Sequence, residues 1–363
     1  MGQSPDSDSY NDNEDGIPFF QGNADFGEKY PTTRKWCNAP TKIAHAEDIL
    51  ISVRAPIGAL NYAKEECCIG RGLAAITPNQ DKVSSGFIYW LLKGKHKELN
   101  LQGTGSTFKA ISRKVLEEIK VPDIELKKQT ELAGSLEKVY SVIQLRKQQL
   151  EELDILIKAR FVEMFGDPVS NPFNYDKVRL SQIADIKIGP FGSLLHKEDY
   201  IENGHPLVNP SHIVDSKISV DNKLTISNEK YEELGAYKLQ IGDVVMGRRG
   251  EMGRCAVVLE DGLLCGTGSI LIRPTQNVTA DFIQKIISFP SFKKTIEDMA
   301  VGQTMPNLNV PIVSNFEIIH PPVEVQKSYY DFVTQVDKLK VEVQKSLDEM
   351  QILFDSLMQE YFG

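Results

Sequence analysis

Residues 127–165, KKQTELAGSLEKVYSVIQLRKQQLEELDILIKARFVEMF, decide the fold. Apolar side chains recur in this stretch in steps of three and four residues, which places them on one face of a helix, with a gap at the polar turn around Lys147. Residues 326–362 carry the same stripe without a gap. The apolar positions are Leu132, Leu136, Val139, Ile143, Leu150, Leu153, Ile157, Phe161 and Met164 in the first stretch, and Phe332, Val336, Leu339, Val343, Leu347, Met350, Phe354, Leu357 and Tyr361 in the second. A narrow seam over about five heptads is typical of a coiled coil, so we predict two long helices of roughly 55–60 Å each.

The ends of both helices are marked in the sequence. Gly166, with Pro168 soon after it, predicts the end of the first helix, because glycine adopts the left-handed cap and proline cannot continue a helix. Pro122 and Pro322 restrict the chain just before each helix begins. Gly134 lies inside the first helix, where it costs roughly 1 kcal/mol relative to alanine. Either a tight helix crossing or a tolerated defect accounts for it.

Length and composition define the class of protein. A chain of 363 residues suits two or three domains, and its apolar fraction of 41% is enough for globular folding. No apolar run approaches the length of a membrane span and polar residues follow Met1, so we expect no transmembrane helix, no secretory signal peptide, no membrane partner and a cytoplasmic location. The five cysteines form no CxxC pair, which favours free thiols over zinc or disulfide sites. The net charge of −9 argues against nonspecific coating of nucleic acid by the whole chain but allows a local basic surface.

The regions before the first helix and between the two helices look alike. Matching segments recur in the same order, about 190 to 200 residues apart. The pairs are Gly16-Ile17-Pro18-Phe19-Phe20 with Gly204-His205-Pro206-Leu207-Val208, residues 48–53 with 243–247, each followed by an arginine-bearing turn, Cys68-Ile69-Gly70-Arg71-Gly72 with Cys265-Gly266-Thr267-Gly268-Ser269, residues 87–91 with 282–286, Gly103 and Ser106-Thr107 with Gly302-Gln303-Thr304, and residues 121–125 with 320–324.

One globular domain followed by one long helix therefore occurs twice. The predicted fold class is α+β, with two similar globular α/β domains separated by two long antiparallel coiled-coil helices in a pseudo-twofold repeat. If each helix runs away from its own domain, the domains lie at opposite ends of the helical pair. The predicted boundaries are a first domain at 1–124, a first spacer helix at 125–166, a linker at 167–176, a second domain at 177–323 and a second spacer helix at 324–363.

No catalytic motif stands out. The sequence has no Gly-x-x-x-x-Gly-Lys-Ser/Thr phosphate loop. Asn171-Pro172-Phe173 only partly matches the Asn-Pro-Pro-aromatic loop of amine methyl transfer. Asp123 and Glu125 stand at a helix start, whereas a metal site needs carboxylates that converge from separate strands. The six histidines are scattered without metal-binding spacing. We therefore expect no catalytic site, no metal and no cofactor in this chain.

Both globular regions do carry polar loops with basic residues, at 103–109 and 302–309. Asn and Gln side chains can bond adenine bidentately, Arg or Lys can bond guanine, and all of them can contact phosphates. The candidate DNA-binding residues are Arg54, Arg71, Ser106, Thr107, Lys109, Arg248, Arg249, Arg254, Gln303, Thr304, Asn307 and Asn309. Any one of them can equally be a loop residue satisfied by solvent or by capping, but recurrence at matching places in both units favours a functional set.

Two similar but non-identical domains held apart by helices suit duplex DNA, whose grooves repeat every ~34 Å. Because the domains differ in sequence, we predict a target with two unlike halves separated by unread base pairs.

Several short motifs also occur in a characteristic order. They are Met1-Gly2-Gln3-Ser4-Pro5, Gly16-Ile17-Pro18-Phe19-Phe20-Gln21-Gly22, Pro122-Asp123-Ile124, Phe165-Gly166-Asp167-Pro168, Gly302-Gln303-Thr304 and Pro321-Pro322-Val323. In this order, and with the duplicated unit and both helices, the sequence resembles the DNA-specificity subunit of type I restriction–modification systems over nearly its whole length.

The resemblance implies two target-recognition domains, each reading one half of a bipartite double-stranded DNA site. It implies helical regions that act as a ruler and as the docking surface for two methyltransferase subunits, which restriction subunits with translocase activity then join. The chain itself would be noncatalytic. S-adenosylmethionine, Mg and ATP would belong to the partner subunits.

One departure concerns the start of each unit. The second unit opens with residues 178–185 before Ile188-Gly189-Pro190, whereas the first starts at Met1-Gly2-Gln3. We expect this lead-in to supply an edge strand and packing for its domain. Its absence from the first domain predicts a lower stability there.

Two other functions stay open on the sequence alone. A coiled-coil scaffold whose two domains bind proteins agrees with the seam and the acidic balance, and it would show no preference for a DNA sequence. An enzyme with a spatially assembled site would show nuclease or methyltransferase activity on its own.

Overall fold

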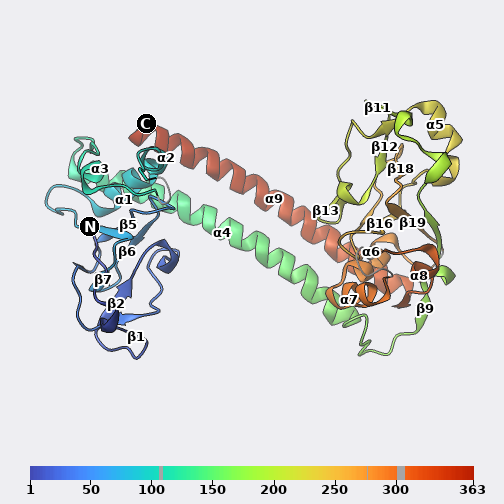
Figure 1. Cartoon of the computed structure of the whole chain (residues 1–363), viewed down its shortest axis with the longest axis horizontal. Coiled ribbons are helices and arrows are strands. Elements are labelled where there is room, and N and C mark those ends of the chain that lie inside the picture. The colour runs from blue at the N-terminus through green and yellow to red at the C-terminus, as the bar shows by residue number, and fades with distance from the viewer. Residues whose placement is uncertain (106–108, 276, 301–306) are drawn as a thin grey trace. The chain divides into compact units, whose positions relative to one another are not determined.

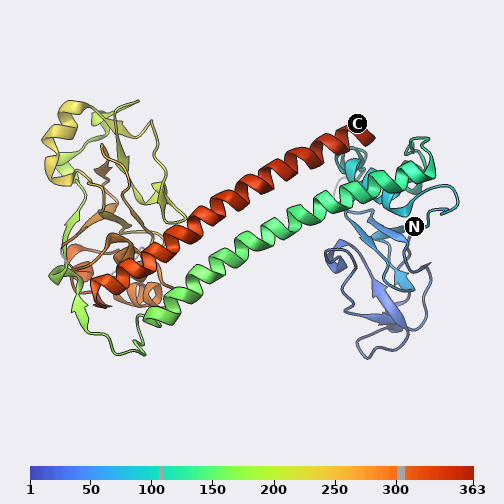
Figure 2. The same cartoon turned by 180° about the vertical axis from the view of Figure 1, so that it is seen from behind.

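The computed structural model describes residues 1–105, 109–275, 277–300 and 307–363. They form two compact units, Met1–Leu150 with Glu342–Gly363, and Glu151–Val341. Two long helices, α4 (Leu126–Phe165) and α9 (Val323–Phe362), contribute one part to each unit (Figures 1 and 2). Each unit is therefore one globular domain with the adjoining parts of both long helices.

The first globular domain combines two small sheets with short helices. One sheet has the strand order β1-β3-β2-β7-β4 and the other has the order β6-β5-β8. The elements are β1 (Tyr10–Asn11), β2 (Ile17–Phe20), β3 (Trp36–Cys37), β4 (Ile43–Ala44), β5 (Ile49–Ser52), β6 (Leu60–Tyr62), β7 (Cys67–Ile69), β8 (Leu73–Ile76), α1 (Ser85–Gly94), α2 (His96–Leu101) and α3 (Arg113–Glu117).

The second globular domain has two four-stranded sheets, in the orders β10-β19-β16-β17 and β11-β15-β12-β18, and the strand pairs β13-β14 and β20-β9. Its strands are β9 (Lys177–Arg179), β10 (Ala184–Ile188), β11 (Tyr200–Ile201), β12 (His205–Val208), β13 (Ile213–Val214), β14 (Lys217–Ile218), β15 (Thr225–Ile226), β16 (Val244–Gly247), β17 (Cys255–Val257), β18 (Leu264–Cys265), β19 (Ser269–Pro274) and β20 (Glu317–Ile319). Its helices are α5 (Asn228–Glu233), α6 (Ala280–Ser288), α7 (Pro290–Met299) and α8 (Val310–Ser314).

The strand pairing gives the two domains one topology. The order β1-β3-β2-β7 repeats as β11-β15-β12-β18, and the order β6-β5-β8 repeats as β17-β16-β19. In both domains one central pair is parallel, β2 with β7 and β12 with β18, while β2 and β12 pair antiparallel with their other neighbours. The predicted fold class, two similar α/β domains joined by two long antiparallel helices, is confirmed at this level.

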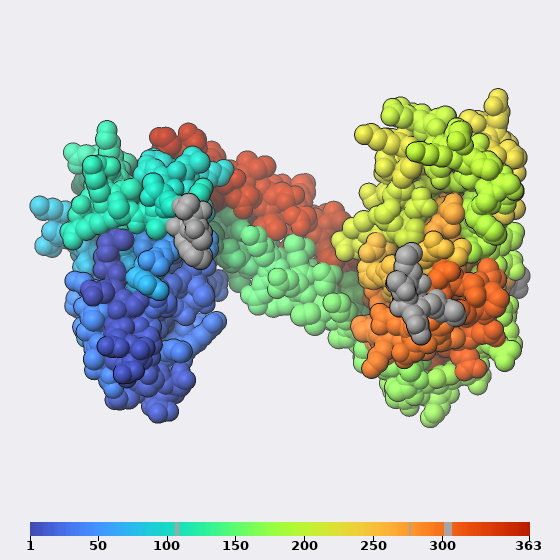
Figure 3. Space-filling model, in the orientation of Figure 1, coloured from blue at the N-terminus to red at the C-terminus, as the bar shows by residue number. Residues whose placement is uncertain are grey.

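Alternating side chains bury both faces of the central sheets. In the second domain Val244 and Met246 of β16 pack in the core with α6 and α7, whereas Val245 between them packs on the opposite face with Val208 of β12. The same domain therefore has layers, with α6 and α7 on one side of β16 and β19 and with β12 and α5 on the other (Figure 1). Figure 3 shows the corresponding division of its surface into a yellow-green part and an orange part.

Within each unit the two long helices pack antiparallel. In the first unit Tyr140 of α4 lies 5.8 Å from Phe354 of α9, measured between ring centroids, and Trp90 of α1 contacts both rings. In the second unit Phe161 of α4 lies 5.5 Å from Tyr329 of α9. Early residues of α4 thus meet late residues of α9, and late residues of α4 meet early residues of α9, as the apolar stripes predict.

The seam of α9 differs from the prediction at one position. Leu339, assigned to an uninterrupted stripe, is 56% exposed. The neighbouring Lys340 is half-buried, and its Nζ lies 2.6 Å from Oδ1 of Asp154 on α4. The prediction was wrong because the step after Val336 can be three or four residues, and here the fourth residue faces α4.

Gly166 ends α4 as predicted, with φ of +68°. Its N–H donates to the carbonyl of Val162 at 2.9 Å, which satisfies one of the last carbonyls of the helix. A Cβ at this position would lie 2.4 Å from Cγ of Pro172. At Gly134, by contrast, a Cβ would meet nothing within 4 Å, so this glycine is a tolerated defect and does not mark a helix crossing.

A buried glutamine ties the start of each long helix to its domain. Gln129 of α4 accepts from the N–H of Ser84 at 2.9 Å and donates to the carbonyl of Ile124 at 2.7 Å. Gln326 of α9 accepts from the N–H of Thr279 at 3.1 Å, and its Nε2 donates to the carbonyls of Pro321 at 2.8 Å and Asn277 at 3.3 Å. Both glutamines connect the long helix to the residue at which a domain helix, α1 or α6, begins.

The lead-in of the second domain forms β9 and the first residues of β10. Strand β9 pairs with β20, and β10 is the edge strand beside β19, with Ala184 opposite Pro274 and Ile188 opposite Ile270. The expectation of an edge strand is confirmed. Among the residues described, no helix is both long and apolar enough to cross a membrane.

Candidate nucleic-acid interface

In the first unit the Arg54 turn and the 103–109 loop lie side by side although they are far apart in sequence. Arg54 forms an isolated antiparallel bridge with Ala110. The N–H of Ala55 donates to the carbonyl of Lys109 at 3.1 Å. The side chains of Arg54 and Lys109 are both exposed, and within the described part of the chain neither forms an ion pair. Two uncompensated cations therefore lie at one junction of turn and loop.

The second unit has a similar junction between the Arg248-Arg249 turn and the 302–309 loop. Arg249 forms an antiparallel bridge with Asn307. The neighbouring Arg248 is half-buried, and its Nε donates to Oδ1 of Asn307 at 3.0 Å. Burial, and next the charge of Arg249, lower the pKa of Arg248 from its usual value. Arg249 itself is exposed and, among the residues described, has no ion pair.

Backbone hydrogen bonds give the two junctions the same register. In the first unit the N–H of Ile111, the residue after Ala110, donates to the carbonyl of Val53, the residue before Arg54, at 2.9 Å. In the second unit the N–H of Leu308, the residue after Asn307, donates to the carbonyl of Arg248, the residue before Arg249, also at 2.9 Å. Both donors are buried in their domain cores. Arg54 and Arg249 therefore occupy equivalent positions, although the sequence alone matched Arg54 with the Arg248-Arg249 pair as a whole.

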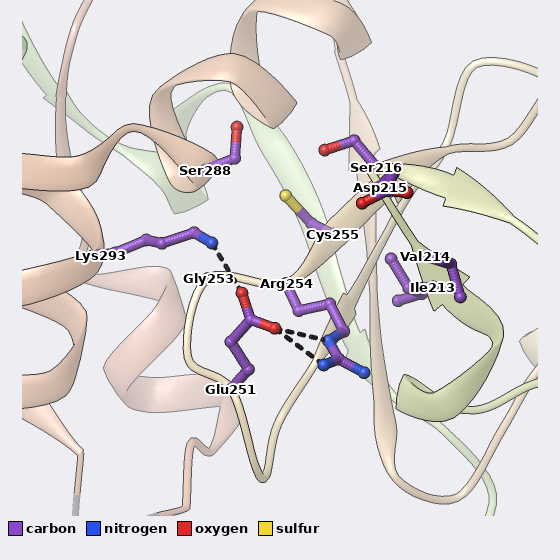
Figure 4. A pocket seen from close by; sticks show the side chains of 10 residues that line it. All are labelled: Ile213, Val214, Asp215, Ser216, Glu251, Gly253, Arg254, Cys255, Ser288 and Lys293. Carbon is purple, nitrogen blue, oxygen red and sulfur yellow. Dashed lines mark hydrogen bonds and ion pairs between the residues drawn. The ribbon is translucent and has the colours of Figure 1, made fainter. Parts of the chain in front are cut away.

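Two further candidates in the second unit already serve the fold. Asn309 is the N-cap of α8, and its Oδ1 accepts from the N–H of Ile312 at 2.9 Å. Arg254 lines a cavity of about 400 Å³, where its Nη2 lies 2.8 Å from Oε2 of Glu251. Figure 4 shows that Lys293 turns toward the same carboxylate, at 2.9 Å. One carboxylate thus compensates both cations, and their hydrogen bonds lower the pKa of Glu251.

Arg71 lies at a different place on the first domain. It lines a cavity of about 530 Å³ together with Gln21, Arg34 and Lys35. The sequence did not single out these three residues, and its only signal was the place of Gln21 in the motif of residues 16–22. The candidates Ser106, Thr107, Gln303 and Thr304 lie outside the described residues.

Within the described ranges, no group of three His, Cys, Asp or Glu side chains is placed to hold a metal ion. The cysteines are free and buried, and burial raises the pKa of Cys67, Cys255 and Cys265 to about 12. Because thiolates are the reactive form, these thiols are inert at neutral pH.

Comparison with known proteins shows the family of this chain. The family model "Type I restriction modification DNA specificity domain" matches residues 1–154 and again 172–349. The chain belongs to this family. The duplicated match agrees with the repeated topology, and the resemblance inferred from the sequence motifs is confirmed.

Individual relatives of this type I specificity chain agree with the family. A protein assigned as the type I restriction enzyme MjaX specificity subunit of Methanocaldococcus jannaschii is 43% identical over 154 residues, which is 42% of this chain and 36% of that subunit. The chain thus matches only about a third of that relative's length.

Two solved structures share the fold. A structure from a study of complex assembly and conformational transition of the type I R-M system has a TM-score of 0.60 at 17% identity, and the match covers 95% of this chain and 91% of that one. The S subunit of the type I restriction–modification system from M. genitalium has a TM-score of 0.54 at 17% identity, covering 100% of this chain and 92% of the other. The family match assigns the chain to the type I specificity family, and the two structures show that it shares their fold.

Proposed function

We propose that each globular domain reads one half of a bipartite double-stranded DNA site through its junction of arginine turn and polar loop. The observation that carries this proposal is the repeat of one exposed, unpaired arginine, Arg54 and Arg249, at the same backbone position in both domains. A surface arginine that is merely solvated has no reason to recur at one backbone position of both domains. An exposed arginine beside a polar loop is instead suited to a phosphate or a guanine edge.

The residues around each arginine differ between the domains, which supports two unlike half-sites. The first junction adds the ammonium group of Lys109, whereas the second adds Arg248 with its partner Asn307. Ammonium and guanidinium groups bond guanine, and amides bond adenine. The same scaffold therefore presents different hydrogen-bonding groups in the two domains.

We further propose that the chain is noncatalytic and works with partner subunits in the cytoplasm. Both long helices expose apolar side chains away from their seam, which supports docking of two methyltransferase subunits and, through them, of restriction subunits with translocase activity. These side chains include Leu145, Ile155, Leu156, Val162, Leu339, Val341, Ile352 and Leu353. S-adenosylmethionine, Mg and ATP would then be bound by the partners.

The test compares Arg54→Ala with Arg249→Ala in the full chain bound to methyltransferase subunits. Each variant is expected to relax the sequence preference in one half-site only, a different half for each, or to lower the slope of log K against log salt by about 1 if the contact is to phosphate. Arg179→Ala, at an exposed arginine of β9 outside the junctions, is the control and should change neither quantity. Unchanged binding by both junction variants would contradict the proposal.

A further inference from the structure

The cavity beside Arg71 is a second feature of the first domain with the chemistry of a nucleic-acid site. It has a volume of about 530 Å³, and its lining residues are Ser4, Tyr10, Phe19, Gln21, Asp25, Arg34, Lys35 and Arg71. They come from chain segments that β2, β3 and β7 bring together, because β2 pairs with both of the other strands. None of these residues belongs to the Arg54 junction.

The cations of this cavity outnumber its carboxylates. Arg34, Lys35 and Arg71 are exposed, and none of the described residues forms an ion pair with them. The lining has one carboxylate, Asp25, whose Oδ2 accepts from the backbone N–H groups of Gln21 and Gly22 at 2.7 and 3.2 Å, so three cations face one anion in this cavity. In the cavity of Arg254 a carboxylate lies between two cations, whereas here three cations surround an open space.

The amide of Gln21 is held at the rim of this space. Its Nε2 lies 3.0 Å from the hydroxyl oxygen of Ser4. The turn at Gly70 allows this position, because a Cβ on Gly70 would lie 2.6 Å from Oε1 of Gln21. Arg71 follows that glycine directly, and its N–H points to the same Ser4 hydroxyl at 3.4 Å. The side chain of Gln21 and the backbone of Arg71 are thus held next to each other through Ser4.

The equivalent turn of the second domain carries different groups. Gly70 and Gly266 correspond, because the N–H of each donates to the last residue of the preceding parallel strand, Phe20 at 2.8 Å and Val208 at 3.0 Å. Asn209 then stands in the place of Gln21, and Thr267 in the place of Arg71. Both domains thus have an amide side chain beside this turn, but only the first has a cation. Such a difference would give the two domains preferences for different bases.

We propose that this cavity is a further DNA-contact site of the first domain, in which Gln21 and Arg71 bond the edge of a purine while Arg34 and Lys35 contact a backbone phosphate. The inference rests on the proposed DNA-reading function and adds a base-specific position to it. An amide can bond adenine bidentately and a guanidinium can bond guanine, whereas lysine or arginine contacts to phosphate are independent of sequence.

The experiment selects bound sequences from a random duplex pool with the full chain and methyltransferase subunits. Gln21→Ala and Arg71→Ala should each remove a purine preference at one base pair of one half-site and weaken binding to the preferred duplex roughly 5- to 100-fold. The double variant Arg34→Ala with Lys35→Ala should weaken all sequences equally and lower the salt slope by about 2. Thr267→Ala, the matched change in the second domain, should leave this half-site as it is.

Local misfolding of the first domain would remove the preference at every base pair of its half-site, whereas loss of one contact removes the preference at one base pair only. The half-site of the second domain reports whether the rest of the chain is folded. If the unsubstituted chain prefers two half-sites and neither Gln21→Ala nor Arg71→Ala changes that preference, this inference is overturned while the proposed function stands. A uniform loss in those two variants, without a change of preferred base, would overturn the base contact. No sequence preference in the unsubstituted chain would instead refute the proposed function.

Discussion

At the residue scale, two glycines of the same helix have opposite consequences. Gly134 is in the interior of α4, where a side chain would meet open space. Gly166 lies just beyond the end of the helix in the left-handed conformation, with Pro172 close to where a side chain would project. Glycine in a helix interior loses conformational entropy on folding without any gain in packing, whereas glycine at a left-handed cap avoids steric strain.

We therefore expect substitution by alanine to change stability in opposite directions. Gly134→Ala should raise the free energy of unfolding by about 0.5 to 1 kcal/mol, because alanine favours the helix and meets no neighbour. Gly166→Ala should lower it by about 1 kcal/mol or more. Thermal unfolding midpoints of the two variants measure the difference. A lower midpoint for Gly134→Ala would mean that this face of α4 is covered by something the described residues do not supply.

At the element scale, Gln129 and Gln326 set where each long helix leaves its domain. Both are almost fully buried, and each amide spans the space between the long helix and the first residues of α1 or α6. Buried polar groups are costly unless every donor and acceptor is paired, so these residues tie element to element more specifically than apolar contacts do.

Removing either amide should destabilise the unit in which it lies. Gln129→Ala and Gln326→Ala should each cost about 1 to 3 kcal/mol, because the N–H of Ser84 or Thr279 loses its acceptor in a buried place. Gln344→Ala is the control, since Gln344 is an exposed glutamine of α9 whose side chain, among the described residues, hydrogen-bonds only to Asp348. Denaturant unfolding measures all three. If Gln326→Ala lowers the free energy of unfolding no more than Gln344→Ala does, the hydrogen bonds of Gln326 do not hold α9 to its domain.

The sequence predicted those features that depend on local periodicity. Apolar steps gave both long helices, and Gly166 gave the end of α4, because such signals act within a few residues. The choice between Leu339 and Lys340 in the seam was not predictable, since it depends on Asp154 of the other helix. The bridge from Arg54 to Ala110 and the cavity around Arg71 join segments distant in sequence, so only the sheets of the folded domain bring them together.

At the scale of the whole molecule, one domain topology occurs twice with different polar groups on it. The chain has a net charge of −9, yet both junctions and the cavity beside Arg71 present exposed cations that form no ion pair with the described residues. Local cations on an acidic chain favour contact at particular places over general attraction to nucleic acid. Duplication with divergence at those places is what a protein that reads two unlike DNA segments needs.

The sequences that the full chain binds, selected from random duplexes in the presence of the methyltransferase subunits proposed as its partners, test this account most directly. Two equivalent junctions with different side chains predict two short specified segments, unlike in sequence and separated by base pairs without preference. A single continuous motif, two identical halves, or no motif at all would contradict it.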